Sequence, residues 1–208
     1  MTSGEKGIFC ESMAGLFSPP DGENFRHLFS SFPQIWTCGN GDPTVPSGFE
    51  SELNTEVLSD IQKDYERLFL GRGECVSLVE SAYKPWTLDP ECRLSFAREK
   101  GLLMGDSALH MAAIFQCAGV EVPEQFVACP DHLVLELEFL AALYREVGDR
   151  EVEQFIGDHL DWIPELKKEI MKLHPHAFYR SAVETLDLFL HRERERLEKE
   201  GYGSKSVS

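Results

Sequence analysis

The chain has 208 residues, of which 42% are hydrophobic and 27% charged, and its formal net charge at pH 7 is −16. This length suits one well-packed domain, and the composition is that of an ordinary globular protein. Nucleic acid is disfavoured as a partner, because binding the phosphate backbone requires clustered Lys and Arg. The acidic excess is largest in residues 101–150, where eight acids face two bases. This excess favours a basic peptide partner, with solubility alone as the alternative explanation.

The cysteines and the N-terminus indicate the cellular compartment. Six cysteines are scattered without a Cys-x-x-Cys pair or a zinc-finger spacing, which predicts free thiols in a reducing environment. The first residues lack a basic region followed by an apolar run, so we expect no signal peptide. Nor is any apolar run long enough to span a bilayer. We therefore expect a cytoplasmic protein without membrane insertion.

Apolar residues recur at helical spacing along most of the chain, and no segment shows the sustained alternation of a strand. Helices are predicted over residues 5–17, 21–32, 52–70, 93–103, 107–118, 130–147, 151–162, 164–173 and 177–199. Residues 37–50 are rich in Gly, Pro and Ser, and residues 71–90 contain prolines and aromatic rings, so both are predicted to be irregular. Asp106 or Ser107 is the expected N-cap of the helix that follows.

These patterns predict the fold class and the domain organisation together. The fold class is all-α, a single-domain helical bundle of roughly eight or more helices. The domain occupies residues 1–200, and residues 201–208 are expected to form a flexible tail. We expect a monomer or a dimer that exchanges helices between protomers.

The predicted helix over residues 130–147 carries polar groups at its start. Pro130 suits a first turn, where its missing N–H costs nothing, and Asp131 suits the positive end of the helix dipole. His132 and Glu136 are four residues apart and share one face. The apolar stripe of the helix consists of Leu133, Leu137, Leu140, Tyr144 and Val147. A helix with titratable side chains at its N-terminus and an apolar body is suited to binding a partner at that end.

The Pro-Asp-His that starts this helix, followed by Glu-Leu-Glu-Phe, resembles the signature of the TorD/DmsD family of redox-enzyme maturation chaperones. Cys129 stands where that family carries Glu. Five further segments resemble the family in the same order: Asp-Tyr-Glu-Arg-Leu-Phe at 64–69, Glu-Ser-Ala-Tyr at 80–83, Gly-Asp-Ser at 105–107, His-Leu-Asp-Trp-Ile-Pro at 159–164 and Phe-Tyr-Arg at 178–180. Together the matching segments cover roughly residues 60–190.

The resemblance implies a TorD-like helical chaperone that is not an enzyme and needs no cofactor of its own. Its implied partners are a twin-arginine leader peptide and the apo-form of a molybdopterin-dependent oxidoreductase. The guanidinium groups of such a leader suit carboxylates and aromatic faces, and its apolar run suits an apolar groove. The binding residues expected from the family segments and from the face shared with His132 are Tyr83, Trp86, Pro130, Asp131, His132 and Glu136.

Other interpretations of the same residues stay open. Asp131 alone is explained by the helix dipole, and His132 by a hydrogen bond that holds the preceding loop. A helical metal-dependent enzyme would use His132, Glu136 and His159 as ligands. An assembly factor for a nitrate-reductase-type subunit without a leader is a further alternative. No convincing nucleophile elbow or phosphate loop is present.

Overall fold

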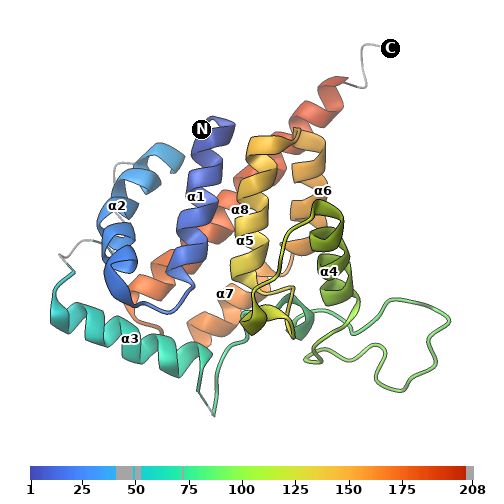
Figure 1. Ribbon diagram of the computed structural model, residues 1–208, viewed down its shortest axis with the longest axis horizontal. Helices are drawn as coiled ribbons and strands as arrows, with labels where there is room; N and C mark the ends of the chain where they lie inside the picture. The colour runs from blue at the N-terminus through green and yellow to red at the C-terminus, as the bar shows by residue number, and fades with distance from the viewer. Residues whose placement is uncertain (41–48, 50–52, 72, 205–208) are drawn as a thin grey trace.

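The computed structural model describes residues 1–40, 49, 53–71 and 73–204 (Figure 1). Within these residues the chain forms eight α-helices and two short 3-10 helices, without a named strand. This confirms the predicted all-α fold. The elements are α1 (Ser3–Leu16), α2 (Gly22–Asn40), α3 (Thr55–Phe69), η1 (Glu80–Ala82), α4 (Asp106–Ala118), η2 (Glu124–Phe126), α5 (Leu133–Glu146), α6 (Asp149–His159), α7 (Ile163–Lys172) and α8 (Ala177–Ser204).

The centre of the bundle is the pair formed by α1 and α5, which run side by side in Figure 1. Gly7 of α1 permits this close approach, because a Cβ at that position would lie 3.2 Å from the carbonyl oxygen of Ala141. The predicted stripe of α5 is buried along the helix, as Leu133, Leu137, Leu140 and Tyr144 show. Val147 is the exception, because it caps the helix and is 43% exposed.

Helix α5 begins three residues later than predicted, so Pro130 lies before the helix and not in its first turn. His132 is the N-cap, and its Nδ1 accepts a hydrogen bond from the backbone N–H of Val134 at 3.2 Å. The residues around the start of α5 pair instead with those around the start of η1. Glu80 N donates to the carbonyl oxygen of Asp131 at 3.0 Å, and Leu133 N donates to Leu78 at 2.8 Å.

The predicted helix over residues 93–103 is wrong, since this segment forms turns within a wide loop that projects from the bundle in Figure 1. The backbone of this segment forms hydrogen bonds across the loop. For example, Thr87 N donates to the carbonyl oxygen of Ala97 at 2.9 Å. Gly101 and Met104 adopt positive φ angles of 86° and 57°, which a right-handed helix does not contain. Helix propensity is overridden here by pairing between the two arms of the loop.

The N-cap predicted for α4 is also wrong, because Gly105 occupies that position. A Cβ there would lie 2.5 Å from the carbonyl oxygen of Trp86, so the close approach requires glycine. The carboxylate of Asp106 instead accepts two hydrogen bonds from the loop, from Thr87 Oγ1 at 2.8 Å and from Leu88 N at 3.0 Å.

The ends of two helices differ from the sequence prediction. Helix α2 continues through Pro33 to Asn40, so it enters the stretch 37–50 that was predicted to be a loop. Helix α8 continues to Ser204, beyond the expected end near residue 199. Most of the predicted loop and the last residues of the predicted tail, 205–208, lie outside the described residues. No helix in the described ranges has both the length and the apolar character needed to cross a bilayer.

Candidate functional site

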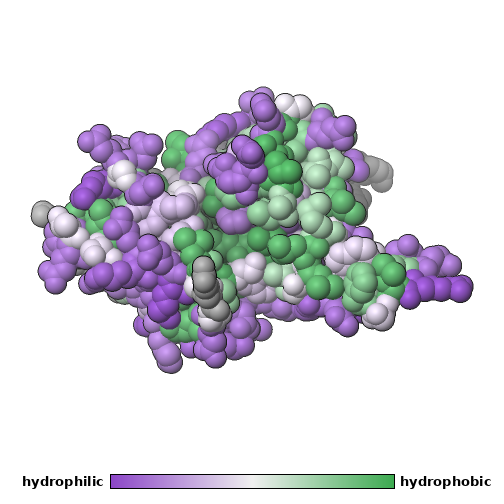
Figure 2. Space-filling model, turned by 60° about the horizontal axis from the view of Figure 1, so that its bottom comes forward, coloured by the Kyte–Doolittle hydropathy of each residue, from purple (hydrophilic) through white to green (hydrophobic). Residues whose placement is uncertain are grey.

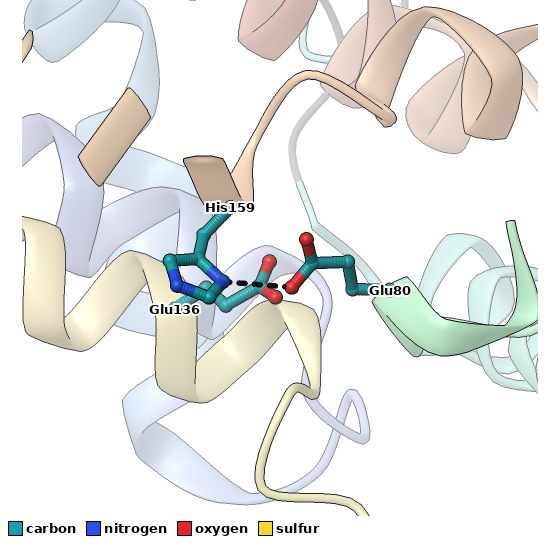
Figure 3. A group of neighbouring side chains, drawn as sticks. All are labelled: Glu80, Glu136 and His159. Carbon is teal, nitrogen blue, oxygen red and sulfur yellow. Dashed lines mark hydrogen bonds and ion pairs between the residues drawn. The ribbon is translucent and has the colours of Figure 1, made fainter. Parts of the chain in front are cut away.

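Three titratable side chains from three elements meet inside the bundle. Glu80 comes from η1, Glu136 from α5 and His159 from the last position of α6. Figure 3 shows the three side chains pointing toward one another. One nitrogen or oxygen atom of each lies within 4.8 Å of the others. The glutamates are fully buried and the histidine is 1% exposed, so these three residues form a buried polar cluster.

His159 links this buried cluster to the surface. Its Nδ1 lies 2.9 Å from Glu80 Oε2, and its Nε2 lies 2.9 Å from Nδ1 of the exposed His110. The other carboxylate oxygen of Glu80, Oε1, forms an ion pair with Lys84 Nζ at 2.6 Å. Although burial acts to raise the pKa of Glu80, the bond to His159 and the charge of Lys84 hold this pKa below its usual value.

Glu136 has the opposite environment. Its Oε2 accepts a hydrogen bond from Trp162 Nε1 at 3.2 Å, whereas its Oε1 is buried without a hydrogen-bond partner. Burial, followed by the neighbouring Glu80 carboxylate, raises the pKa of Glu136 well above its usual value. The cluster therefore joins two carboxyl groups whose pKa values shift in opposite directions.

Asp131 is a third fully buried carboxyl group and fastens η1 to the start of α5. Its Oδ2 accepts hydrogen bonds from the backbone N–H and the hydroxyl of Ser81, the former at 2.8 Å. Burial raises the pKa of Asp131, while the bonds from Ser81 act to lower it. In this structure neither Asp131 nor Glu136 reaches the surface, and both carboxyl groups contact protein groups.

The remaining expected binding residues lie around these buried groups. Pro130 is buried, and burial lowers the pKa of His132 to about 4. Tyr83 and Trp86 are half-buried and therefore accessible. The Tyr83 hydroxyl donates to the carbonyl oxygen of Ser77 at 2.8 Å, and its ring stacks on Trp162 with centroids 4.9 Å apart.

A surface pocket of about 310 Å³ lies next to the buried cluster, and His159 belongs to both. Its lining consists of Lys84, Pro85, Leu88, Asp106, Ser107, His110, Asp158 and His159. Glu80, Lys84 and His110 were not predicted from the sequence as site residues, although Glu80 stands in the family-like Glu-Ser-Ala-Tyr segment. His132, named with Glu136 and His159 as a possible ligand set, is not part of the cluster; Glu80 is its third member.

Apolar side chains are exposed on the loop beside this pocket and on the first turn of α4. Of the eleven large hydrophobic residues exposed within the described part of the chain, five fall within residues 88–109. They are Leu88, Leu94, Leu103, Met104 and Leu109, with exposed fractions between 41% and 69%. Figure 2 shows apolar surface extending over the middle of one face and onto the projecting part. We call these five residues the apolar loop surface.

The comparisons with known proteins identify the family. The sequence model described as nitrate reductase delta subunit matches residues 42–169, which is more than half of the chain and includes the whole buried cluster. No curated protein matches the chain. The family consists of chaperones for molybdoenzyme maturation, to which the segment resemblances in the sequence had pointed. The chain therefore belongs to the nitrate reductase delta subunit family of molybdoenzyme maturation chaperones.

Proposed function

We propose that the chain is a cytoplasmic chaperone that binds the twin-arginine leader and the immature core of a molybdoenzyme subunit. It holds this client until the molybdopterin cofactor is inserted, and it catalyses no reaction. Family membership supports the class of client. The observation that carries the proposed mode of binding is the apolar loop surface next to a pocket lined by Asp106 and Asp158.

The apolar loop surface suits the hydrophobic run of a leader peptide. Apolar residues that gather on an exposed surface mark interaction sites, because leaving them in water costs free energy. Leu88 is 69% exposed and also lines the pocket, so it joins the two parts of the proposed site. An extended or helical leader segment would cover this surface through side-chain contacts.

The pocket suits the guanidinium groups that precede such a run. Asp106 and Asp158 line it, and carboxylates pair with guanidinium groups. Asp106 would offer its Oδ1, because its Oδ2 accepts from Thr87 and Leu88. The charge of Lys84, which also lines the pocket, is compensated by ion pairs with Glu80 and Asp161, each at 2.6 Å. The contacts proposed for the leader are thus ionic in the pocket and apolar on the loop.

The buried residues have a supporting role in this proposal. Asp131 holds Ser81 in place, and Glu136 holds Trp162, on which Tyr83 stacks. Tyr83 and Trp86 contact the leader through their accessible ring surfaces. His132 acts as the cap that fixes the start of α5.

Calorimetric titration of the full chain with a synthetic twin-arginine leader tests the proposal. We expect one leader per chain and weaker binding at higher salt, because ion pairs at a surface are screened. A leader with both arginines replaced by Gln should bind at least tenfold more weakly. If the folded chain binds both peptides equally, or neither, the proposed mode of leader binding is wrong.

Matched leucine variants locate the site. Leu88→Ser should weaken leader binding about tenfold, because the burial of one exposed leucine contributes about 1.5 kcal/mol or more. Leu70→Ser is the control, since Leu70 is 64% exposed but lies at the end of α3, outside the apolar loop surface. Equal affinities for the two variants would place the leader elsewhere.

A second candidate is an assembly factor for a nitrate-reductase-type subunit without a leader. The family description favours it, because it names nitrate reductase. This candidate predicts that the chain binds the apo-subunit with unchanged affinity after any N-terminal leader is removed. Binding that requires the leader would reject it in favour of the first.

A further inference from the structure

Three fully buried carboxyl groups, those of Glu80, Asp131 and Glu136, lie around the end of α6 and the start of α5. Lys84 compensates part of this charge through Oε1 of Glu80, and its side chain is 23% exposed. Burying several carboxylates costs free energy unless each is paired. Additional positive charge, either a proton or a cation, would therefore stabilise the cluster.

The donor atoms lie close enough together for small side-chain movements to bring them onto one cation. Glu80 Oε2 and His159 Nδ1 lie 2.9 Å apart, and the three donor atoms all lie within 4.8 Å of one another. Ligands about 2.0–2.2 Å from a shared ion are themselves about 3–4 Å apart. Oε1 of Glu136, fully buried and without a hydrogen-bond partner, points independently to a missing ligand.

Each of these three side chains is oriented by a second contact made through its other polar atom. Lys84 holds Oε1 of Glu80, and Trp162 Nε1 holds Oε2 of Glu136. His159 Nε2 contacts His110, as ligating histidines commonly contact an outer partner. One donor atom of each residue is left to face the centre of the cluster.

We infer that Glu80, Glu136 and His159 bind one divalent transition-metal ion of the zinc class. Imidazole and carboxylate ligands together suit zinc or manganese better than calcium or magnesium, which favour oxygen alone. The pocket lined by His159 brings solvent next to one of the three ligands. The ion cross-links η1, α5 and α6, and its role is to fix the segment that carries Tyr83 and Trp86. The metal site itself is argued from the cluster alone, and its test needs no leader peptide.

Metal titration of the chelator-treated full chain tests this inference. Titration calorimetry with zinc chloride should show one high-affinity site, and elemental analysis after gel filtration should find about one zinc per chain. Thermal unfolding should shift upward by about 5 °C or more with zinc, because a ligand of the native state stabilises it. Magnesium chloride at the same concentration should produce neither result. A folded chain that retains no zinc would overturn the inference.

Two glutamine variants of α5 separate the cluster from other zinc-binding side chains. Glu136→Gln keeps the size of the side chain and the acceptor for Trp162 but removes the carboxylate, so it should lose the site. Glu138→Gln removes an exposed carboxylate two residues away and should retain it. If Glu136→Gln binds zinc with wild-type affinity, the ion occupies another place and the cluster holds a proton instead.

Discussion

Helix α5 carries a buried charged network near each end, and the two differ in balance. Near its C-terminus, Tyr144 donates to Glu193 Oε2 at 3.0 Å, and the same oxygen forms a 2.8 Å ion pair with Lys6. Burial acts to raise the pKa of Glu193, but Lys6 and Arg196 together hold it below its usual value. Near the N-terminus, Glu136 keeps an unpartnered oxygen and a raised pKa. The first network is complete within the chain, whereas the second is completed by a proton or a ligand.

The network near the C-terminus of α5 consists of Lys6, Tyr144, Glu193 and Arg196, and we call it the balanced network. Removing Glu193 should have the largest effect on stability, because the other three residues all contact it. Glu193→Ala leaves the ammonium group of Lys6 buried without its ion-pair partner, since Lys6 is only 6% exposed. We expect the free energy of unfolding to fall by about 3–5 kcal/mol. Urea denaturation of the variant and the wild type measures the difference.

Lys6→Met is the control for that experiment. Glu193 would still accept from Tyr144 and pair with Arg196, so the loss should be smaller, about 1–2 kcal/mol. A loss as large as that of Glu193→Ala would mean that Lys6, and not Glu193, is the centre of the network.

Asp131→Ala should have the next largest effect, about 2–3 kcal/mol, because it leaves the buried N–H of Ser81 without an acceptor. The loss is smaller than for Glu193, since removing one carboxyl group also relieves repulsion among the three. Hydrogen exchange measured by mass spectrometry should show faster exchange in residues 79–84. Ser81→Ala, which loses only the hydroxyl bond, should cost about 1 kcal/mol. A larger cost than that of Asp131→Ala would contradict this ranking.

The regular parts of the fold could be predicted from the sequence because their apolar spacing is local information. Helices α3 and α5 were predicted from the spacing of residues that the structure buries, such as Ile61 and Leu137. The segment 93–103 has a similar composition but forms turns, because Thr87 and Trp86 bond to its backbone across the loop. Such pairing is a tertiary effect that a helical pattern does not reveal.

Only the part of the site that is local in the sequence could be predicted. The start of α5 was recognised from Asp131 and His132, which adjoin each other in the chain. Glu80 and His159 bond across 79 residues, and His110 joins them from a third element. Their convergence depends on how η1 crosses α5 and α6, and no spacing in the sequence encodes that crossing.

His132 sets a pH dependence that differs from that of the balanced network. Its pKa is about 4 in the folded chain, against a usual value of 6.5, because burial disfavours the charged ring. Between these values the unfolded chain binds more protons, so stability falls as the pH drops below about 6.5. His132→Asn keeps an N-cap and removes this titration. From pH 8 to pH 5 the wild type should therefore lose about 2 kcal/mol more than the variant in urea denaturation. Parallel losses would show that His132 is not the group responsible.

Glu136→Gln should have the smallest effect on stability among these variants. In chelator-treated protein we expect the free energy of unfolding to change by less than about 0.5 kcal/mol, because Glu136 is fully buried without an ion-pair partner and a neutral amide avoids the cost of burying its charge. The Gln carbonyl still accepts from Trp162, and the neutral amide removes a negative charge next to Glu80. Urea denaturation with and without zinc separates the two states of the cluster. A loss above about 2 kcal/mol without metal would mean that the chain itself pairs this carboxylate, which would make the two ends of α5 alike.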